Sequence, residues 1–149
     1  MNIASILARK GMDVFTVRPE QSLREALGLL ARHNVGALVV VDDALRPIGI
    51  LSERDIVREA ARNERLFSGT VSDLMTRDVF VGGPQDDLIS VGHTMIEKRI
   101  RHVPVVDGGK LVGIVSIGDV VKAQRDQYQG EVDTLQTQLL DDPGSTAKR

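Results

Sequence analysis

The sequence has 149 residues, of which 42% are hydrophobic and 27% are charged, with a formal net charge of −2 and no cysteine. This length allows one compact domain or two half-size units that share a core. The nearly balanced charge gives no general attraction to nucleic acid or to an anionic membrane. The lack of cysteine excludes disulfides, thiolate nucleophiles and cysteine-ligated zinc. The start of the chain lacks the pattern of a secretory signal. We therefore expect a cytoplasmic protein with neither a membrane nor a nucleic-acid partner.

Strand and helix signals alternate along the first part of the chain. Residues 13–17 (DVFTV) form a short β-rich segment, and Ser22 is suited to cap a helix with apolar residues at 3–4 spacing. Residues 37–41 (ALVVV) are typical of a buried strand, and a turn joins them to a second strand at residues 48–51 (IGIL). Ser52 then opens another helix. The predicted order is strand, helix, strand, strand, helix, with a further helix before the first strand.

The second half of the chain repeats this order after a shift of 65 residues. DVFTVRPEQSL (13–23) lies on DVFVGGPQDDL (78–88), which predicts a first strand DVFV over residues 78–81. One deletion in the next turn places GILSERD (49–55) on GIVSIGD (113–119). Units of this length are shorter than most independent domains. The predicted fold class is therefore α/β (α+β), with two pseudo-symmetric β-α-β-β-α repeats packed as one body.

The repeats divide the chain into four parts. The first repeat with its N-terminal helix spans residues 1–62, a linker 63–70, the second repeat 71–123, and a C-terminal helix with a flexible tail 124–149. The tail, DDPGSTAKR, is predicted to be disordered. The C-terminal helix has an apolar seam that either packs on the chain's own body or pairs with a second subunit. The seam residues are Tyr128, Val132, Leu135 and Leu139.

We call GILSERD (49–55) and GIVSIGD (113–119) the repeated phrase. It places a serine and an aspartate three residues apart at the start of the second helix of each repeat. The first pair is Ser52 and Asp55, and the second is Ser116 and Asp119. This spacing is that of a capping box, which needs no ligand. The same geometry can hold a nucleoside phosphate, because a helix N-terminus favours phosphate and a carboxylate can accept hydrogen bonds from ribose hydroxyls. The glycine that opens each phrase likewise serves either tight packing or a ligand.

Over residues 1–123 the chain resembles a pair of CBS domains. The twin phrases GILSERD and GIVSIGD, the RHVPVVD strand and the VSDLMTRDVF entry carry this resemblance. It implies a flat body with a cleft on each side, clefts that hold adenosine-containing ligands, and a disc-shaped homodimer. It also implies that Asp55 and Asp119 bind ribose and that Ser52 and Ser116 contact phosphate.

The two copies differ in ways that single out further candidates. Arg54 either pairs with phosphate or forms a solvated salt bridge, and the second phrase has Gly118 in its place. Arg101 could neutralise a phosphate, and His102 either lies near it or is a partly buried structural imidazole. Since the second phrase has an apolar entrance and Arg101 stands in the strand of the same repeat, we expect the Asp119 cleft to bind more tightly than the Asp55 cleft. The resemblance adds candidate adenine-side wall residues, namely Thr16, Val17, Val35, Ala37, Val79 and Val81.

The sequence offers no catalytic motif. G-x-S-x-G, the phosphate-binding G-x-x-x-x-G-K and H-E-x-x-H are all absent, and the three histidines lack close metal-ligand spacing. We interpret the chain as a regulatory module rather than an enzyme, with no required cofactor and no metal. Its ligand would be an adenine nucleotide (AMP, ADP, ATP or NAD-like), and an unknown effector protein would read the signal. The alternatives are a nucleotide-independent dimerisation module and a sensor of an S-adenosyl ligand.

Overall fold

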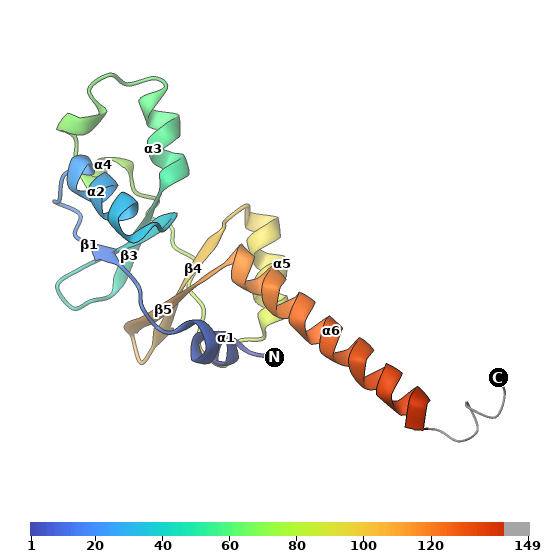
Figure 1. The fold of residues 1–149 in the computed structure, drawn as a ribbon. Helices are drawn as coiled ribbons and strands as arrows, with labels where there is room; N and C mark the ends of the chain where they lie inside the picture. Colours follow the sequence, from blue (N-terminus) through green and yellow to red (C-terminus); the bar gives the residue numbers. More distant parts are fainter. Residues whose placement is uncertain (142–149) are drawn as a thin grey trace.

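Each repeat contributes one small sheet in the computed structural model, which describes residues 1–141 (Figure 1). In the first sheet, β1 (Thr16–Val17) runs parallel to β2 (Ala37–Val41), and β2 pairs antiparallel with β3 (Pro47–Ser52). The second sheet pairs β4 (His102–Asp107) antiparallel with β5 (Lys110–Ser116). The predicted disordered tail lies outside the described residues, apart from its first residue.

The first strand of the second repeat is the one predicted element that is missing from the described chain. Instead of a strand over residues 78–81, a single parallel bridge joins Gly82 to Val105. Gly82 donates its N–H to the Pro104 carbonyl, and its own carbonyl accepts from the Val106 N–H. A second glycine and Pro84 follow directly. Glycine and proline both weaken strand pairing, and this explains why the predicted strand shrinks to one bridge.

The predicted helices of the two repeats begin and end in the same way. α2 (Leu23–His33) is capped by Ser22, and α5 (Leu88–Lys98) is capped by Asp87. Both helices stop at a residue with positive φ, which is 51° at Asn34 and 57° at Arg99. Each sheet then leads directly into a helix that starts within the repeated phrase, namely α3 (Glu53–Ala60) and α6 (Ile117–Asp141).

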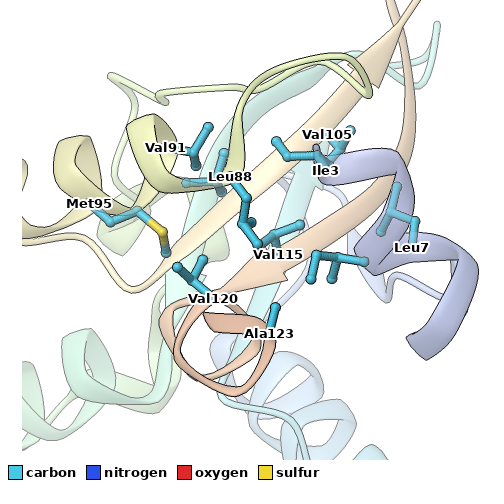
Figure 2. Packing of buried hydrophobic residues seen from close by; sticks show 11 residues of the cluster. Ile3, Leu7, Leu88, Val91, Met95, Val105, Val115, Val120 and Ala123 are labelled. Carbon is cyan, nitrogen blue, oxygen red and sulfur yellow. The ribbon is translucent and has the colours of Figure 1, made fainter. Parts of the chain in front are cut away.

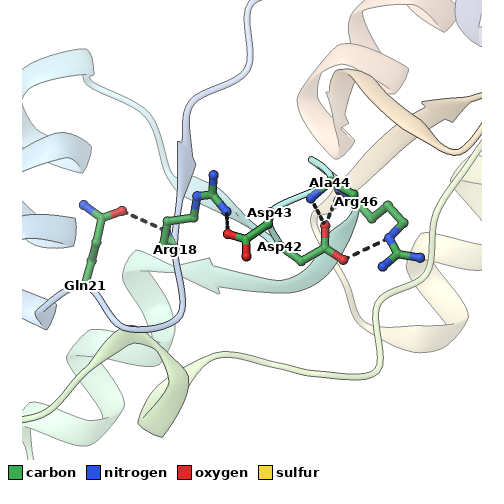
Figure 3. A network of polar contacts seen from close by, with 6 residues as sticks. All are labelled: Arg18, Gln21, Asp42, Asp43, Ala44 and Arg46. Carbon is green, nitrogen blue, oxygen red and sulfur yellow. Dashed lines mark hydrogen bonds and ion pairs between the residues drawn. The ribbon is translucent and has the colours of Figure 1, made fainter.

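A polar network fixes the turn between β2 and β3 in the first repeat (Figure 3). Asp42 Oδ1 accepts hydrogen bonds from the N–H groups of Ala44 and Arg46, each at 2.9 Å. The Arg46 guanidinium returns to Asp42 Oδ2 at 2.9 Å. Arg18, at the end of β1, reaches Asp43 at 2.8 Å. The turn is thereby tied to the strand that precedes α2.

The short helices at the start of each repeat pack on the opposite repeat. α1 (Ile3–Lys10) places Ile3, Ile6 and Leu7 in the core of the second repeat (Figure 2). α4 (Val71–Leu74) and the following Met75 belong instead to the core of the first repeat. The predicted linker contributes as well, through the 3-10 helix η1 (Leu66–Ser68), whose Leu66 is buried in the first core. The two repeats are therefore joined by an exchange of helices.

The glycine that opens each repeated phrase permits this exchange. A Cβ at Gly49 would lie 2.6 Å from Met75 Sδ, and a Cβ at Gly113 would lie 2.9 Å from a Leu7 methyl group. No real Cβ atom tolerates such distances without movement of its neighbours. Of the two interpretations of these glycines, tight packing is the one that the structure supports.

α6 is one continuous helix of 25 residues. Val120 and Ala123 are buried in the second core, and beyond them the helix projects away from the body (Figure 1). Tyr128, Leu135 and Leu139 are 70%, 59% and 57% exposed. The alternative that this seam packs on the chain's own body is therefore wrong for the described residues. Within residues 1–141, no helix combines the length and the apolar character needed to cross a membrane.

Candidate functional site

Both repeated phrases form capping boxes at their helix starts. The Asp55 N–H donates to Ser52 Oγ at 3.2 Å, and Asp55 Oδ2 accepts from the Ser52 N–H at 3.2 Å. In the second phrase, the Asp119 N–H donates to Ser116 Oγ at 3.1 Å, and Asp119 Oδ2 accepts from the Ser116 N–H at 2.8 Å. The capping interpretation is thus confirmed for both phrases. Each cap uses only Oδ2, and within residues 1–141 neither Oδ1 has a hydrogen-bond partner.

A lysine distinguishes Asp119 from Asp55. Lys10, the last residue of α1, places its Nζ 2.6 Å from Asp119 Oδ2 and donates to the Ile114 carbonyl at 2.9 Å. Partial burial raises the pKa of Asp119, but the hydrogen bonds from Lys10 and Ser116 outweigh it and hold the pKa below its usual value. Asp119 is therefore an anion at neutral pH. The counterpart of Lys10 in the second repeat is Met75, which packs in the first core and carries no charge.

A cavity of about 280 Å³ opens beside this ion pair. Three segments form its walls: the chain that leaves α1, the entry to β2, and the facing ends of β4 and β5. This volume lies just below the range for small-molecule pockets, which is roughly 300–1,000 Å³. Since residues of both repeats line the cavity, ligand binding there would depend on the orientation of one repeat relative to the other. The lining residues are Lys10, Asp13, Val14, Phe15, Val35, Gly36, Ala37, His102, Ile114 and Ser116.

Two rings line this cavity, those of Phe15 and His102. Phe15 stacks on His33 of α2, with ring centroids 3.7 Å apart and an angle of 8° between the planes. Burial lowers the pKa of His102, and the positive charge of Lys10 lowers it further. His102 is therefore neutral at pH 7, so the cavity takes its positive charge from Lys10.

The structure brings together only some of the predicted binding residues. Ser116, His102, Ala37 and Val35 line the cavity, and Asp119 is bonded to two lining residues. Six other lining residues were not predicted from the sequence. Phe15 and its neighbours could have been found from the strand signal of the first repeat, but nothing local marks Lys10. The missed residues are Lys10, Asp13, Val14, Phe15, Gly36 and Ile114.

Other predicted residues lie away from this cavity. Val17 is 2% exposed, belongs to the first core and does not line this cavity. Thr16, Arg54, Val81 and Gly118 are exposed and are absent from the lining.

Repeat symmetry assigns two further candidates to the opposite side. Val79 and Arg101 are the counterparts of Val14 and Gly36, which line the Asp119 side. Arg101 is exposed, and its carbonyl accepts from the Ile117 N–H at 2.8 Å, as the Gly36 carbonyl accepts from the Glu53 N–H at 2.9 Å. The symmetry therefore places Arg101 with Asp55 rather than with Asp119.

A second hollow of about 370 Å³ lies between α2, the end of α3 and η1. Glu59, Asn63, Arg65 and Asp73 contribute its polar atoms, and no residue of either repeated phrase lines it. Among residues 1–141, no cluster of three or more histidine, aspartate or glutamate side chains is arranged to hold a metal ion.

Comparison with known families identifies the repeats. Residues 3–62 and residues 71–126 each match the family described as CBS domain. The chain belongs to the CBS domain family. The match ends at residue 126, so most of the exposed part of α6 lies beyond the CBS repeats.

Solved structures of other CBS proteins have the same fold. The CBS-domain containing protein ATU1752 from Agrobacterium tumefaciens is 41% identical, with a TM-score of 0.78 over 83% of this chain and 99% of its own. CBSX2, solved in complex with AMP, is 28% identical, with a TM-score of 0.69 over 84% and 97% of the two chains. The CBS domain pair of protein MJ0100, in complex with 5′-methylthioadenosine and S-adenosyl-L-methionine, is 26% identical, with a TM-score of 0.72 over 85% and 98%.

Proposed function

We propose that this CBS protein is a regulatory module, not an enzyme, that binds an adenine nucleotide in the cavity beside Asp119. One observation carries the proposal: a cavity shared by both repeats is lined at one end by the ammonium-bearing Lys10 and the capping Ser116, and both are bonded to the anionic carboxylate of Asp119. Related CBS structures with AMP and with S-adenosyl ligands support an adenosine-containing ligand.

Each part of a nucleotide has a suitable partner there. Asp119 Oδ1 can accept from a ribose hydroxyl while Oδ2 keeps the helix cap. Ser116 and the N-terminus of α6 favour a phosphate group, as does the ammonium of Lys10. Val14, Phe15, Val35 and Ala37 offer apolar surface for the base. A phosphorylated ligand such as AMP, ADP, ATP or an NAD-like dinucleotide uses all three regions.

The exchanged helices suggest how binding would be transmitted. Lys10 ends α1, which packs on the second repeat, and the following segment lines the cavity before entering β1 of the first repeat. A ligand in the cavity would contact this connection and both repeats at once. It would shift the module only if it binds one arrangement more tightly than another. We propose that an effector protein, or a change in homodimer assembly, reads that shift.

Two alternatives have specific support. The capping boxes give both repeated phrases a role without ligand, and this favours a nucleotide-independent interaction module. Asp13 is a lining residue of the cavity, and its carboxylate could pair with the cationic group of an S-adenosyl ligand. Lys10 opposes that second alternative, because it adds positive charge to the same cavity.

A ligand-induced thermal shift separates these functions. Adenosine, AMP, ATP, NAD and S-adenosylmethionine would each be tested against the full chain. A ligand at 100 times its dissociation constant stabilises a fold by about 2.7 kcal/mol. We expect AMP or ATP to give such a shift, Asp119→Asn to abolish it, and the matched variant Asp55→Asn to retain it. If no adenosine compound shifts melting at millimolar concentration, the nucleotide function is refuted and the interaction module is preferred.

A further inference from the structure

From residue 121 onward, α6 has an apolar stripe that nothing within residues 1–141 covers. We call it the α6 seam. Its most exposed members are Tyr128 and Leu135, at 70% and 59%, whereas Val132 is half-buried. The buried side of the same helix ends at Ala123, so the seam does not continue the packing of the second core. The apolar residues of the α6 seam are Val121, Tyr128, Val132, Leu135 and Leu139.

The α6 seam follows the spacing of a two-stranded coiled coil. Positions 121, 125, 128, 132, 135 and 139 are separated alternately by four and three residues. This alternation is the a/d rhythm of a heptad, with 125, 132 and 139 at a and 121, 128 and 135 at d. Valine at a and leucine at d, as at Val132 and Leu135, suit two parallel strands. The stretch from 121 to 139 is about 27 Å long, at about 1.5 Å per residue.

Arg125 is the one polar residue at an a or d position of the α6 seam. A charged side chain at a single a position lowers stability but helps to set register and orientation. Its long aliphatic stem can lie along the seam while the guanidinium reaches water. Arg125 lies 3.7 Å from Asp126 of its own helix, which already draws its charge away from the seam.

The flanks of the α6 seam favour a second copy of the same chain. The e and g positions are occupied by Lys122, Gln124, Gln129, Glu131, Gln136 and Gln138. In a parallel dimer the g residue of one helix meets the next e residue of the other. These pairs are Gln124 with Gln129 and Glu131 with Gln136, so the flanking e and g positions bring no like charges together. The one like-charge contact of the dimer is at an a position, where the Arg125 side chains of the two copies meet. Only Lys122 and Glu131 are charged among these e and g residues, so the flanks offer little basis for electrostatic recognition of a different, charged partner.

We propose that a second copy of this chain covers the α6 seam as a parallel two-stranded coiled coil. Apart from Val121 and Arg125, the α6 seam lies beyond the matched CBS repeats, so most of this contact is separate from any pairing of the repeats themselves. It does not depend on nucleotide binding. It would hold two CBS pairs together at a fixed end and leave their cavities free.

Cysteine cross-linking tests this proposal directly, because the chain contains no cysteine. Leu135→Cys places a thiol at a d position, where two parallel helices bring identical residues together. Gln127→Cys is the matched control, because residue 127 is exposed on another face of α6. Under mild oxidation at micromolar concentration, we expect Leu135→Cys to form a disulfide-linked dimer nearly completely and Gln127→Cys to stay almost wholly monomeric on a non-reducing gel. Equal cross-linking of the two variants, or none at position 135, would overturn the proposal.

A charge substitution gives an independent readout on the full chain. We expect Leu135→Lys to raise the dimer dissociation constant at least tenfold in sedimentation equilibrium, whereas Gln127→Lys leaves it unchanged. If the repeats also dimerise through another face, the cross-linking result still reports on the α6 seam alone. Failure of either experiment leaves the nucleotide shift of the full chain unaffected, so the two proposals can fail separately.

Discussion

Replacing Lys10 with methionine tests how the cavity selects its ligand. Methionine keeps most of the side-chain volume but removes the ammonium group that contacts Asp119 at 2.6 Å. The side chains of this pair are 31% and 23% exposed, so solvent weakens their attraction. Partly exposed pairs of this kind contribute about 0.5–1 kcal/mol. We therefore expect the free energy of unfolding of the ligand-free protein to fall by only about that amount.

The effect on binding depends on whether the ligand carries a phosphate. A hydrogen bond to a charged group contributes about 1.5–3 kcal/mol. If Lys10 leaves Asp119 to meet a phosphate, the net gain is that value less the broken pair, or about 1–2 kcal/mol. Since about 1.4 kcal/mol is a tenfold change in affinity, Lys10→Met should weaken AMP roughly 5- to 30-fold. Adenosine should bind equally well or a few-fold more tightly, because Asp119 is no longer engaged.

Isothermal titration calorimetry with AMP and with adenosine measures this ratio. Arg9→Met is the matched control, because Arg9 is the exposed neighbour on the same helix and does not line the cavity. The control should leave both affinities unchanged. A Lys10→Met protein that loses AMP and adenosine affinity by the same factor would refute the reasoning, since Lys10 would then not distinguish phosphate.

The remaining predictions concern packing and pH. Gly113→Ala should lower the free energy of unfolding by about 1–3 kcal/mol in urea titrations, because the new Cβ meets Leu7 at 2.9 Å. Gly130→Ala, which meets nothing within 4 Å, should instead increase the helical circular dichroism of α6 by removing a cost of about 1 kcal/mol. Burial lowers the pKa of His102, so its contribution to stability is complete above about pH 6.5 and is lost as the pH falls through the lower folded-state pKa. Urea titrations from pH 7.5 to 5 should show this loss, and His102→Gln should remove it. The pKa of Asp119 is also lowered, so its contribution is present above about pH 3.8 and lost as the pH falls through its folded-state pKa.

Each of these has an outcome that contradicts it. An unchanged midpoint for Gly113→Ala would show that Leu7 moves aside without cost. A pH dependence that persists in His102→Gln would assign the titration to another group. Acid sensitivity below pH 3.8 should weaken in Lys10→Met, and an unaltered acid limb would show that Lys10 does not set the pKa of Asp119.

Much of the fold could be predicted from the sequence because the same order of strand and helix signals occurs in both repeats. Ser22 caps its helix as expected, and all five residues of β2 are buried as a run of apolar residues implies. The prediction of a strand over residues 78–81 was wrong because it relied on the β-rich sequence DVFV and gave too little weight to the two glycines and the proline that follow. A strand needs a partner along its whole length, and this part of the backbone pairs only at Gly82.

The candidate site was less predictable because its parts are distant in sequence. Ser116 and Asp119 carry a local signal, since a cap requires their spacing. Lys10 is separated from Asp119 by 109 positions, and only the packing of α1 on the second repeat brings them together. Arg101 was expected beside Asp119, but a shift of 65 residues shows it to be the counterpart of Gly36. The sequence shows that the two repeats are alike, but it does not show how they pack on each other and therefore which residues meet at the cavity.

The helix exchange also determines what a fragment of this protein would look like. Cutting the chain between residues 63 and 70 would give one half with α1 but without the sheet that α1 covers. The other half would carry α4 and Met75 but lack their sheet. Each half would expose apolar residues that the intact chain buries and would bind its missing counterpart. Because each repeat completes the hydrophobic core of the other, separating the two repeats would disrupt both cores.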